Sequence, residues 1–359
     1  MKKIQMVFRF GCIALLALWA TGCATKVVDT QRYFWPMVPD VPRIEWLGAY
    51  STESDVKEAS WLDAIAGKED EAGLGQPLFV AADGMGKIYV TDLRVRGVVM
   101  IDLVNKEFKV VGGEEASGYF LRITGVALDG EGNIYAADGN SKKIIVFSKE
   151  HQVKSVLDLS QHVKNIASFA IDRSRKRIIV PDSWGHQIVT FGLDGSFIAK
   201  TGKRGEGDGE FNYPSSVAID PDGNLVVCDA MNARIQRLTP DLKFISKFGK
   251  RGDGVGEFNI IKAAAVDSEG HIYVTDSKSH RVAIFNAGGE VLLSIGGPFS
   301  ARPGSSITPG GFLLPQGIYI DQNDSIYVVD QFNARVQKFQ YLTEKYLKEH
   351  PIDPATVAK

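Results

Sequence analysis

Histidine is the residue of this chain best suited to metal or acid–base chemistry, because its ring titrates near neutral pH and often binds metals. The chain has six histidines: His151, His162, His186, His271, His280 and His350. A catalytic zinc normally takes about three protein ligands. The sequence has no histidine pair at helical spacing, no Cys-x-x-Cys-His haem motif and no recognisable Ser/His/Asp arrangement. The residue types therefore predict no metal, no cofactor and no catalytic site.

Aspartate is the second candidate for acid–base chemistry, because it recurs at regular spacing. Six aspartates each end a short apolar run: Asp92, Asp138, Asp182, Asp229, Asp276 and Asp330. Four of them precede a basic residue by five positions, in the pairs Asp138/Lys143, Asp229/Arg234, Asp276/Arg281 and Asp330/Arg335. Across a four-residue loop such pairs can meet and satisfy polar groups that packing would otherwise bury unpaired. We interpret them as structural ion pairs rather than as catalytic carboxylates.

The residues around these aspartates form a repeating unit. From one closing aspartate to the next the steps are 46, 44, 47, 47 and 54 residues. An earlier aspartate, nine or ten residues before each, ends another strand: Asp83, Asp129, Asp172, Asp220, Asp267 and Asp321. The copy from Glu210 to Gly249 contains four short strands separated by Gly, Pro, Asn and Asp turns. Six such copies predict an all-β, six-bladed β-propeller, in which neighbouring blades bury each other's faces.

The motifs of this unit resemble the NHL repeat over about residues 43 to 340. The last three blades match it most closely, through Asn232-Ala-Arg234, His280-Arg281 and Asn333-Ala-Arg335. The first three blades have Gly97, Lys143 and Gln187 at the arginine position. NHL propellers include lyases, RNA binders and protein scaffolds. The resemblance therefore implies the fold and leaves the activity open.

The resemblance also suggests an enzyme hypothesis, a divergent propeller lyase or hydrolase. Amidating lyases of this fold hold zinc with histidines at the channel end of several inner strands. The corresponding positions here contain no histidine and read Pro77-Leu-Phe, Arg122-Ile-Thr, Ile166-Ala-Ser, Pro214-Ser-Ser, Ile261-Lys-Ala and Pro315-Gln-Gly. Only His186 and His280 occupy equivalent loop positions, and their blades are not adjacent. We therefore predict that the protein is not an enzyme. The lyase or hydrolase is kept as an alternative, as is glycan or peptide binding in the central channel.

The N-terminus has the pattern of an export signal. Basic residues precede an uncharged run from Phe10 to Trp19, which is shorter than the roughly 20 residues of a spanning helix. The run ends in Ala20-Thr-Gly-Cys23, which resembles the bacterial lipobox and implies lipidation of Cys23. The alternative is an ordinary signal peptide cleaved nearby. By resemblance to Gram-negative lipoproteins, Ala24 favours the outer membrane, with the protein extracytoplasmic.

The organisation predicted from these features has four parts. They are a signal peptide over residues 1–22, a proline-rich tether over 23–42, the propeller over 43–347 and a C-terminal tail over 348–359. The strand from Arg43 to Tyr50 is expected to complete the sixth blade and close the ring. The competing segment, Leu342 to Leu347, suits a short helix better. A further short helix is expected from Asp55 to Gly67, before the first blade.

Charge and cysteine content narrow the possible partners. After removal of Lys2, Lys3 and Arg9 with the signal, 38 basic side chains remain against 43 acidic ones. A mildly acidic chain without a polybasic run is a poor nucleic-acid binder. Because Cys12 is removed and Cys23 is the predicted lipid site, Cys228 is left as a small buried side chain, and no disulfide can form within the mature chain.

We therefore predict a membrane-anchored scaffold that binds a protein partner and serves as an accessory subunit of a cell-envelope complex. The partner site is placed on the loops between the second and third strands, because aromatic residues, Met and Arg are enriched in protein interfaces. The residues assigned to it are Arg94, Arg96, Trp184, His186, Met231, Asn232, Lys278, His280, Phe332 and Asn333. The alternative for Trp184 and Phe332 is that they fold inward and plug the channel.

Overall fold

The computed structural model describes residues 31–37, 39–57, 72–300, 308–353 and 356–357. The chain divides into a large unit, Tyr33–Pro351, and a small one formed by Met1–Arg32 with Ile352–Lys359. In the small unit, the backbone N–H of Arg32 donates to the carbonyl oxygen of Thr356 over 2.7 Å. The leader and Cys23 lie outside the described residues, as does most of the helix expected from Asp55 to Gly67.

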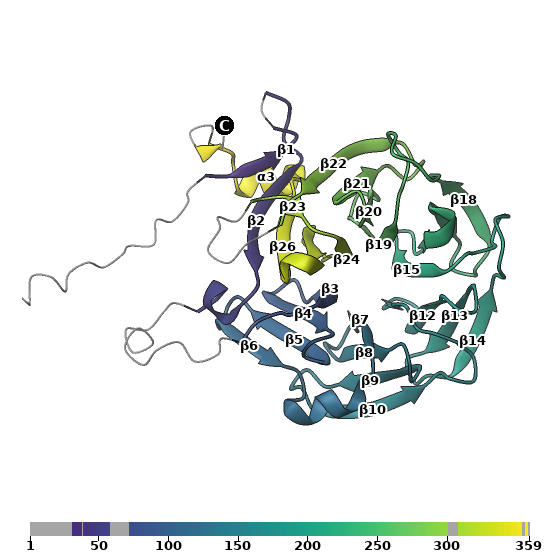
Figure 1. The fold of residues 1–359 in the computed structure, drawn as a ribbon. Helices are drawn as coiled ribbons and strands as arrows, with labels where there is room; N and C mark the ends of the chain where they lie inside the picture. The colour runs from purple at the N-terminus through teal and green to yellow at the C-terminus, as the bar shows by residue number, and fades with distance from the viewer. Residues whose placement is uncertain (1–30, 38, 58–71, 301–307, 354–355, 358–359) are drawn as a thin grey trace, which may run out of the picture. The chain divides into compact units, whose positions relative to one another are not determined.

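The large unit consists of six antiparallel sheets arranged radially around an axis, as Figure 1 shows. Blade one contains β3 (Pro77–Ala82), β4 (Lys87–Asp92), β5 (Gly97–Asp102) and β6 (Glu107–Val110). Blade two contains β7 (Ile123–Leu128), β8 (Ile134–Asp138), β9 (Lys143–Phe147) and β10 (Val153–Asp158). Blade three contains β11 (Ala170–Asp172), β12 (Arg177–Asp182), β13 (Gln187–Gly192) and β14 (Phe197–Thr201). Blade four contains β15 (Pro214–Ile219), β16 (Leu225–Asp229), β17 (Arg234–Leu238) and β18 (Phe244–Phe248). Blade five contains β19 (Ile261–Val266), β20 (Ile272–Asp276), β21 (Arg281–Phe285) and β22 (Val291–Pro298), and the short β23 (Gly311–Phe312) pairs with β22 in parallel. Strands follow one another outward from the axis, and this confirms the predicted four-stranded unit.

Blade six is completed by the N-terminal part of the large unit. It contains β24 (Pro315–Ile320), β25 (Ser325–Asp330), β26 (Arg335–Tyr341), β2 (Ile44–Tyr50) and β1 (Tyr33–Trp35). Strand β2 pairs antiparallel with β26, with Ile44 opposite Tyr341 and Tyr50 opposite Val336. The prediction that an N-terminal strand closes the ring is therefore confirmed. The competing C-terminal segment instead forms α3 (Glu344–Glu349), whose first turn is capped by Thr343.

Strand β1 lies in the segment that the sequence suggested was a tether. Its Phe34 is buried, and Trp35 packs edge-on against Phe339 with ring centroids 5.8 Å apart. Pro36 follows the strand at once, where the missing backbone N–H costs nothing because β1 is an edge strand.

Tight turns between the first and second strands are fixed by the earlier set of aspartates. In blade four, Oδ1 of Asp220 accepts the backbone N–H of Asn224 over 2.8 Å, and Gly223 has a φ of +84° that favours glycine. The core lies between blades rather than within them. For example, Ile88, Val90 and Val99 of blade one pack with Tyr327 and Val329 of blade six. In the described part of the chain, no helix has the length and apolarity needed to cross a bilayer.

Candidate binding face and central cavity

The six aspartates that end the second strands are completely buried and hold the entrance of each blade together. Each accepts hydrogen bonds from the backbone of the segment that leads into the inner strand. In blade four, Asp229 Oδ1 accepts the N–H of Asn212 over 2.6 Å. In blade six, Asp330 Oδ1 accepts the N–H of Leu313 over 2.7 Å. Carboxylates engaged in this way hold the chain in place and are not open to a substrate.

The predicted acid–base pairs differ from blade to blade. Arg335 Nε lies 2.7 Å from Asp330 Oδ2, and Arg234 Nε lies 2.8 Å from Asp229 Oδ2. In blade five the closest approach is longer, 3.8 Å between Arg281 Nη2 and Asp276 Oδ2. In blade two, Lys143 lies opposite Asp138 in the strand register, and these two described residues form no ion pair. The pairs are structural, with their strongest members in blades four and six.

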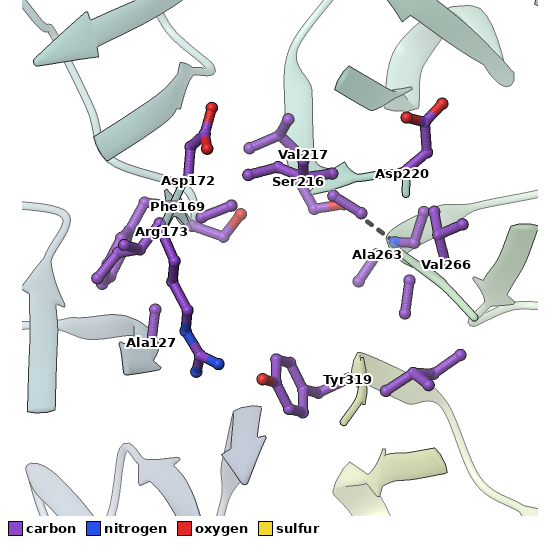
Figure 2. A pocket seen from close by; sticks show the side chains of 18 of the residues that line it. Ala127, Phe169, Asp172, Arg173, Ser216, Val217, Asp220, Ala263, Val266 and Tyr319 are labelled. Atoms are coloured by element: carbon purple, nitrogen blue, oxygen red, sulfur yellow. Dashed lines mark hydrogen bonds between the residues drawn. The ribbon is translucent and has the colours of Figure 1, made fainter. Parts of the chain in front are cut away.

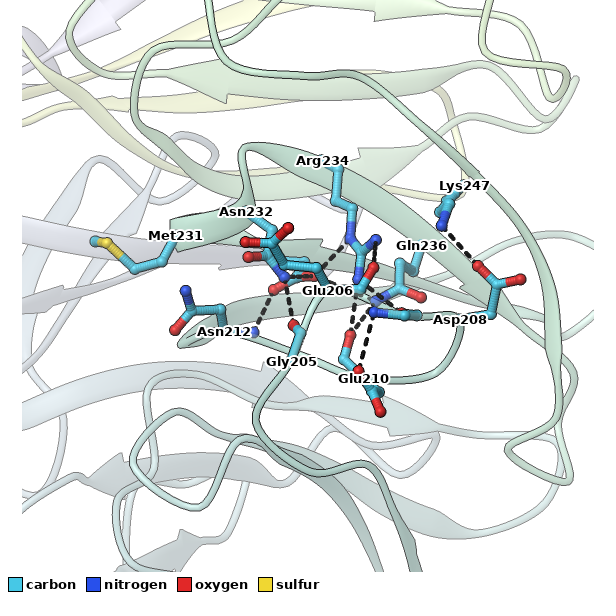
Figure 3. Close-up of polar contacts among 12 residues, drawn as sticks. Gly205, Glu206, Asp208, Glu210, Asn212, Met231, Asn232, Arg234, Gln236 and Lys247 are labelled. Atoms are coloured by element: carbon cyan, nitrogen blue, oxygen red, sulfur yellow. Dashed lines mark hydrogen bonds and ion pairs between the residues drawn. The ribbon is translucent and has the colours of Figure 1, made fainter.

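Arg234 illustrates what such a pair organises. Its Nη groups donate to the carbonyl oxygens of Glu206, Gly207 and Glu210 in the linker between blades three and four. Figure 3 shows this guanidinium enclosed by the linker, while the Met231 side chain points away from the cluster. One buried arginine therefore fixes both the third strand and the path of the incoming linker.

His186 and His280 occupy the equivalent positions expected from the sequence, each directly before a third strand. Nδ1 of His186 accepts the backbone N–H of Tyr213 over 3.2 Å, and Nδ1 of His280 accepts that of Leu314 over 3.1 Å. Each histidine thus joins its blade to the segment entering the next one. Within the ranges that the structure describes, no group of three or more His, Cys, Asp or Glu residues is arranged to hold a metal.

The ten residues assigned to the partner site separate into two groups. Six have exposed side chains: Arg94, Arg96, Trp184, Met231, Lys278 and Phe332. The other four, His186, Asn232, His280 and Asn333, are partly or fully buried and bind neighbouring chain segments. The structure thus brings all ten to the loops but exposes only the first six, of which Arg96 also donates from Nη2 to the carbonyl oxygen of Phe120 over 3.2 Å.

The asparagines were assigned to the surface because they sit at loop tips. Instead, Nδ2 of Asn232 donates to Asp229 Oδ2 and to the carbonyl oxygen of Gly205, both over 2.8 Å. Asn333 makes the corresponding bonds to Asp330 and Phe299. The buried carboxylate attracts the amide donor inward, and the three-residue spacing from aspartate to asparagine was the signal for this in the sequence.

Trp184 and Phe332 are not buried, as a packed plug of the channel mouth would require. Their side chains are 58 % and 60 % exposed, and Met231 is 52 % exposed. Apolar groups of this size held in water at loop tips have no stabilising role that the structure reveals. They are the kind of residue that becomes an anchor when a partner covers it.

Three further exposed apolar residues were missed by the sequence analysis, namely Leu121, Tyr213 and Ile260. Each lies in the segment that leads into an inner strand, so it emerges beside the loops between second and third strands. Tyr213 packs edge-on against His186 with ring centroids 4.7 Å apart, and Met231 donates its N–H to Asn212. We call this set of loops and entry segments the loop face. Its signal in the sequence was an apolar residue within two positions of the start of the inner strands β7, β15 and β19.

The opposite end of the channel contains a cavity of about 530 Å³. Its walls are the far halves of the inner strands, and its mouth is formed by the turns that follow them. Figure 2 shows Arg173 and Tyr319 pointing toward each other across it. Burial raises the pKa of Tyr319, and the positive charge of Arg173 opposes this effect.

Six radial sheets, the Asp-to-Arg pairs and the recurring turns together define the class: the chain is a six-bladed β-propeller, and its fifth blade contains a match to the NHL repeat. A family described as "6-bladed beta-propeller" matches residues 160–242, and the NHL repeat matches residues 258–285.

Solved structures with the same fold have different functions. A Bacteroides thetaiotaomicron protein of unknown function is 17 % identical, with a TM-score of 0.60 over 83 % of this chain and 75 % of that one. An auxiliary nutrient binding protein from the same organism is 14 % identical, with a TM-score of 0.58 over 76 % and 70 % of the two chains. A gluconolactonase from Xanthomonas campestris is 14 % identical, with a TM-score of 0.55 over 83 % and 98 %. Likeness at this level establishes the fold and leaves the activity to the site.

Proposed function

We propose that this propeller is a lipid-anchored, extracytoplasmic binding module that docks a protein partner of the cell envelope on its loop face. The observation that carries the proposal is the collection of exposed Trp184, Met231 and Phe332 on that face, next to the entry-segment residues Tyr213 and Ile260. Exposed aromatic and Met side chains, together with arginines such as Arg94 and Arg96, are of the types enriched in protein interfaces.

The backbone beneath these side chains is well fixed, which favours binding. Arg251 donates from Nη1 to the carbonyl oxygen of Asn259 and from Nη2 to that of Met231, over 2.9 and 3.0 Å. Phe332 donates its N–H to Leu313 over 3.2 Å. An interface held in place before binding loses less conformational entropy on association.

The site gives less support to the lyase or hydrolase alternative. In the described residues the carboxylates at the blade entrances are buried and engaged, and His186 and His280 use Nδ1 to accept backbone hydrogen bonds. The gluconolactonase resemblance supplies a fold and no catalytic residues. A binding role agrees better with the exposed apolar groups, and one neighbour of the fold is itself described as a binding protein.

The experiment is site-specific photo-crosslinking in intact cells. A photoreactive amino acid at Trp184 or Phe332 is expected to capture a discrete envelope protein. The same amino acid at Met85, which is 76 % exposed on a turn at the other end of blade one, is the control. Equal capture from Met85, or no adduct from either loop-face position, would contradict the proposal.

A further inference from the structure

The cavity at the other end of the channel is separate from the loop face and has its own chemistry. Its wall carries apolar side chains of the inner strands, including Ala127, Val217, Ala263 and Val266, and its mouth carries polar groups such as Arg175 and Asp222. A volume of about 530 Å³ falls within the roughly 300–1,000 Å³ of typical small-molecule sites. The cavity can therefore enclose the apolar body of a small ligand.

One cation points into this apolar space. Arg173 Nε donates to the carbonyl oxygen of Leu128 over 3.1 Å, which anchors the side chain to the inner strand of blade two. Its guanidinium then extends toward the middle of the channel, where the hydroxyl of Tyr319 faces it from blade six (Figure 2). The two groups provide hydrogen-bond donors from opposite walls of the same cavity.

The carboxylates near this cation are engaged elsewhere. Asp172 binds Arg177 and Arg175, and Asp220 binds Arg237. In Figure 2 the carboxylates of Asp172 and Asp220 point away from the channel centre. No described carboxylate forms an ion pair with Arg173. Asp222, the remaining acidic group at the mouth, is exposed to solvent. Asp83 and Asp321 act on Tyr319 from outside the cavity lining, and they accept hydrogen bonds from the backbone of Lys87 and the hydroxyl of Tyr327. Arg173 is therefore a cation at the cavity without an ion-pair partner among the described carboxylates.

The serine hydroxyl groups on and just before the inner strands are already engaged. Ser168 Oγ donates to the carbonyl oxygen of Ser215 over 3.1 Å, and Ser216 Oγ accepts the N–H of Ala264 over 3.2 Å. A sugar needs hydrogen-bonding groups along the whole wall, whereas the polar side chains of this cavity gather mainly in the turns at its mouth. An anion with an apolar body fits better, because guanidinium binds a carboxylate through two parallel hydrogen bonds.

We propose that the cavity binds a small monocarboxylate with an apolar body, with its carboxylate on Arg173 and Tyr319 and its apolar part against the inner strands. The same chemistry could come from a free carboxylic acid or from the C-terminal carboxylate of a short apolar peptide. Both sources are included in the test.

The experiment is calorimetric titration of the mature protein with phenylpropanoate, with its neutral amide phenylpropanamide, and with N-acetyl-alanyl-phenylalanine. The variants are Arg173→Gln, Tyr319→Phe and the control Lys176→Gln, which removes an equal charge from the same turn outside the cavity. Thermal melting of each variant verifies that it is folded.

We expect phenylpropanoate or the peptide acid to bind in the millimolar range or tighter, and the amide to bind about tenfold more weakly or not at all. Arg173→Gln should weaken binding about tenfold or more, whereas Lys176→Gln leaves it unchanged. Tyr319→Phe, which removes only one hydroxyl, should weaken binding by a smaller factor. Binding of the peptide acid but not the free acid identifies a peptide terminus as the ligand. Equal binding of acid and amide, equal effects of the two charge-removing variants, or no binding of either acid would overturn the proposal.

Discussion

His186 of blade three and Tyr213, at the entrance of blade four, are joined by a hydrogen bond of 3.2 Å from the backbone N–H of Tyr213 to Nδ1 of the imidazole. Only a ring without a proton on Nδ1 can accept this bond. Burial and the charge of Arg204 lower the pKa of His186 further. The contact between these two blades therefore depends on neutral His186.

This contact should make stability depend on pH. Because the pKa of His186 is lower in the folded state, the unfolded chain binds the proton more tightly. The contribution of this contact to the free energy of unfolding is complete above about pH 6.5, the pKa of a histidine in the unfolded chain. It is lost as the pH falls below that value. We expect His186→Asn, which keeps an acceptor and tolerates the left-handed backbone at φ +55°, to remove this part of the pH dependence. Urea unfolding of both proteins between pH 5 and 8 measures the difference. If the stability of the two proteins changed with pH in the same way, the contact between His186 and Tyr213 would not be the source of the pH dependence.

Arg335 should contribute far more to stability than Arg281. Arg335 is 3 % exposed and bonds to Asp330 and to the carbonyl oxygen of Gly311. We expect Arg335→Met to lower the free energy of unfolding by about 3–5 kcal/mol, because it leaves a buried carboxylate unpaired. Arg281→Met breaks the looser 3.8 Å contact with Asp276 and one hydrogen bond to the carbonyl oxygen of Glu257, and should cost about 1–2 kcal/mol.

The control for this comparison is the double change Asp330→Asn with Arg335→Met. It removes the unpaired charge and should recover part of the lost stability. Denaturant unfolding of the three variants provides the measurement. If both arginine variants lose the same free energy of unfolding, the closer ion pair in blade six does not stabilise the protein more than the looser contact in blade five.

The sequence predicted the sheets well because each strand and turn carries a local signal. Asp220 and Gly223 mark a turn through their own hydrogen bonding and backbone conformation, and the six repeats reinforce one another. The closing strand Ile44–Tyr50 was found for the same reason, since it alternates like the fourth strands of the other blades.

The site was predicted less completely, because the destination of a polar side chain depends on contacts between blades. Asn232 and His186 looked like surface groups, yet both are turned toward linkers that come from elsewhere in the chain. Arg173 was not singled out, because only the ring places it opposite Tyr319. Sequence spacing reveals which residues share a blade, whereas the channel combines residues from several blades.

Cys228 should be unreactive in the folded protein. Its side chain has no exposed surface, and burial raises the pKa of the thiol to about 12. The thiolate is the reactive species and is almost absent at neutral pH. We expect a thiol reagent to modify this residue only after unfolding in guanidinium, with Cys228→Ala identifying the signal. Rapid modification under native conditions would show that blade four opens locally.

Cys23, outside the described residues, is predicted to carry the acyl anchor. One acyl chain gives marginal membrane binding, whereas two or more give stable attachment. Replacing Cys23 by Ser should therefore move the protein from the membrane to the soluble fraction, as measured by cell fractionation. A processed mutant that remains with the membrane would count against the lipid anchor.

The final prediction separates binding from stability on the loop face. Because Trp184 and Phe332 are more than half exposed, the double change of both residues to Ala should leave the melting temperature nearly unchanged. The same change should weaken binding of the crosslinked partner by about 2 kcal/mol or more per residue, the usual effect of removing an aromatic anchor. Met85→Ala, at a still more exposed position on the other face, should change neither quantity. Affinity measured with the purified partner, together with thermal melting, decides the assignment. A double variant that melts much earlier yet binds its partner with unchanged affinity would show that these side chains stabilise the propeller and that the partner binds elsewhere.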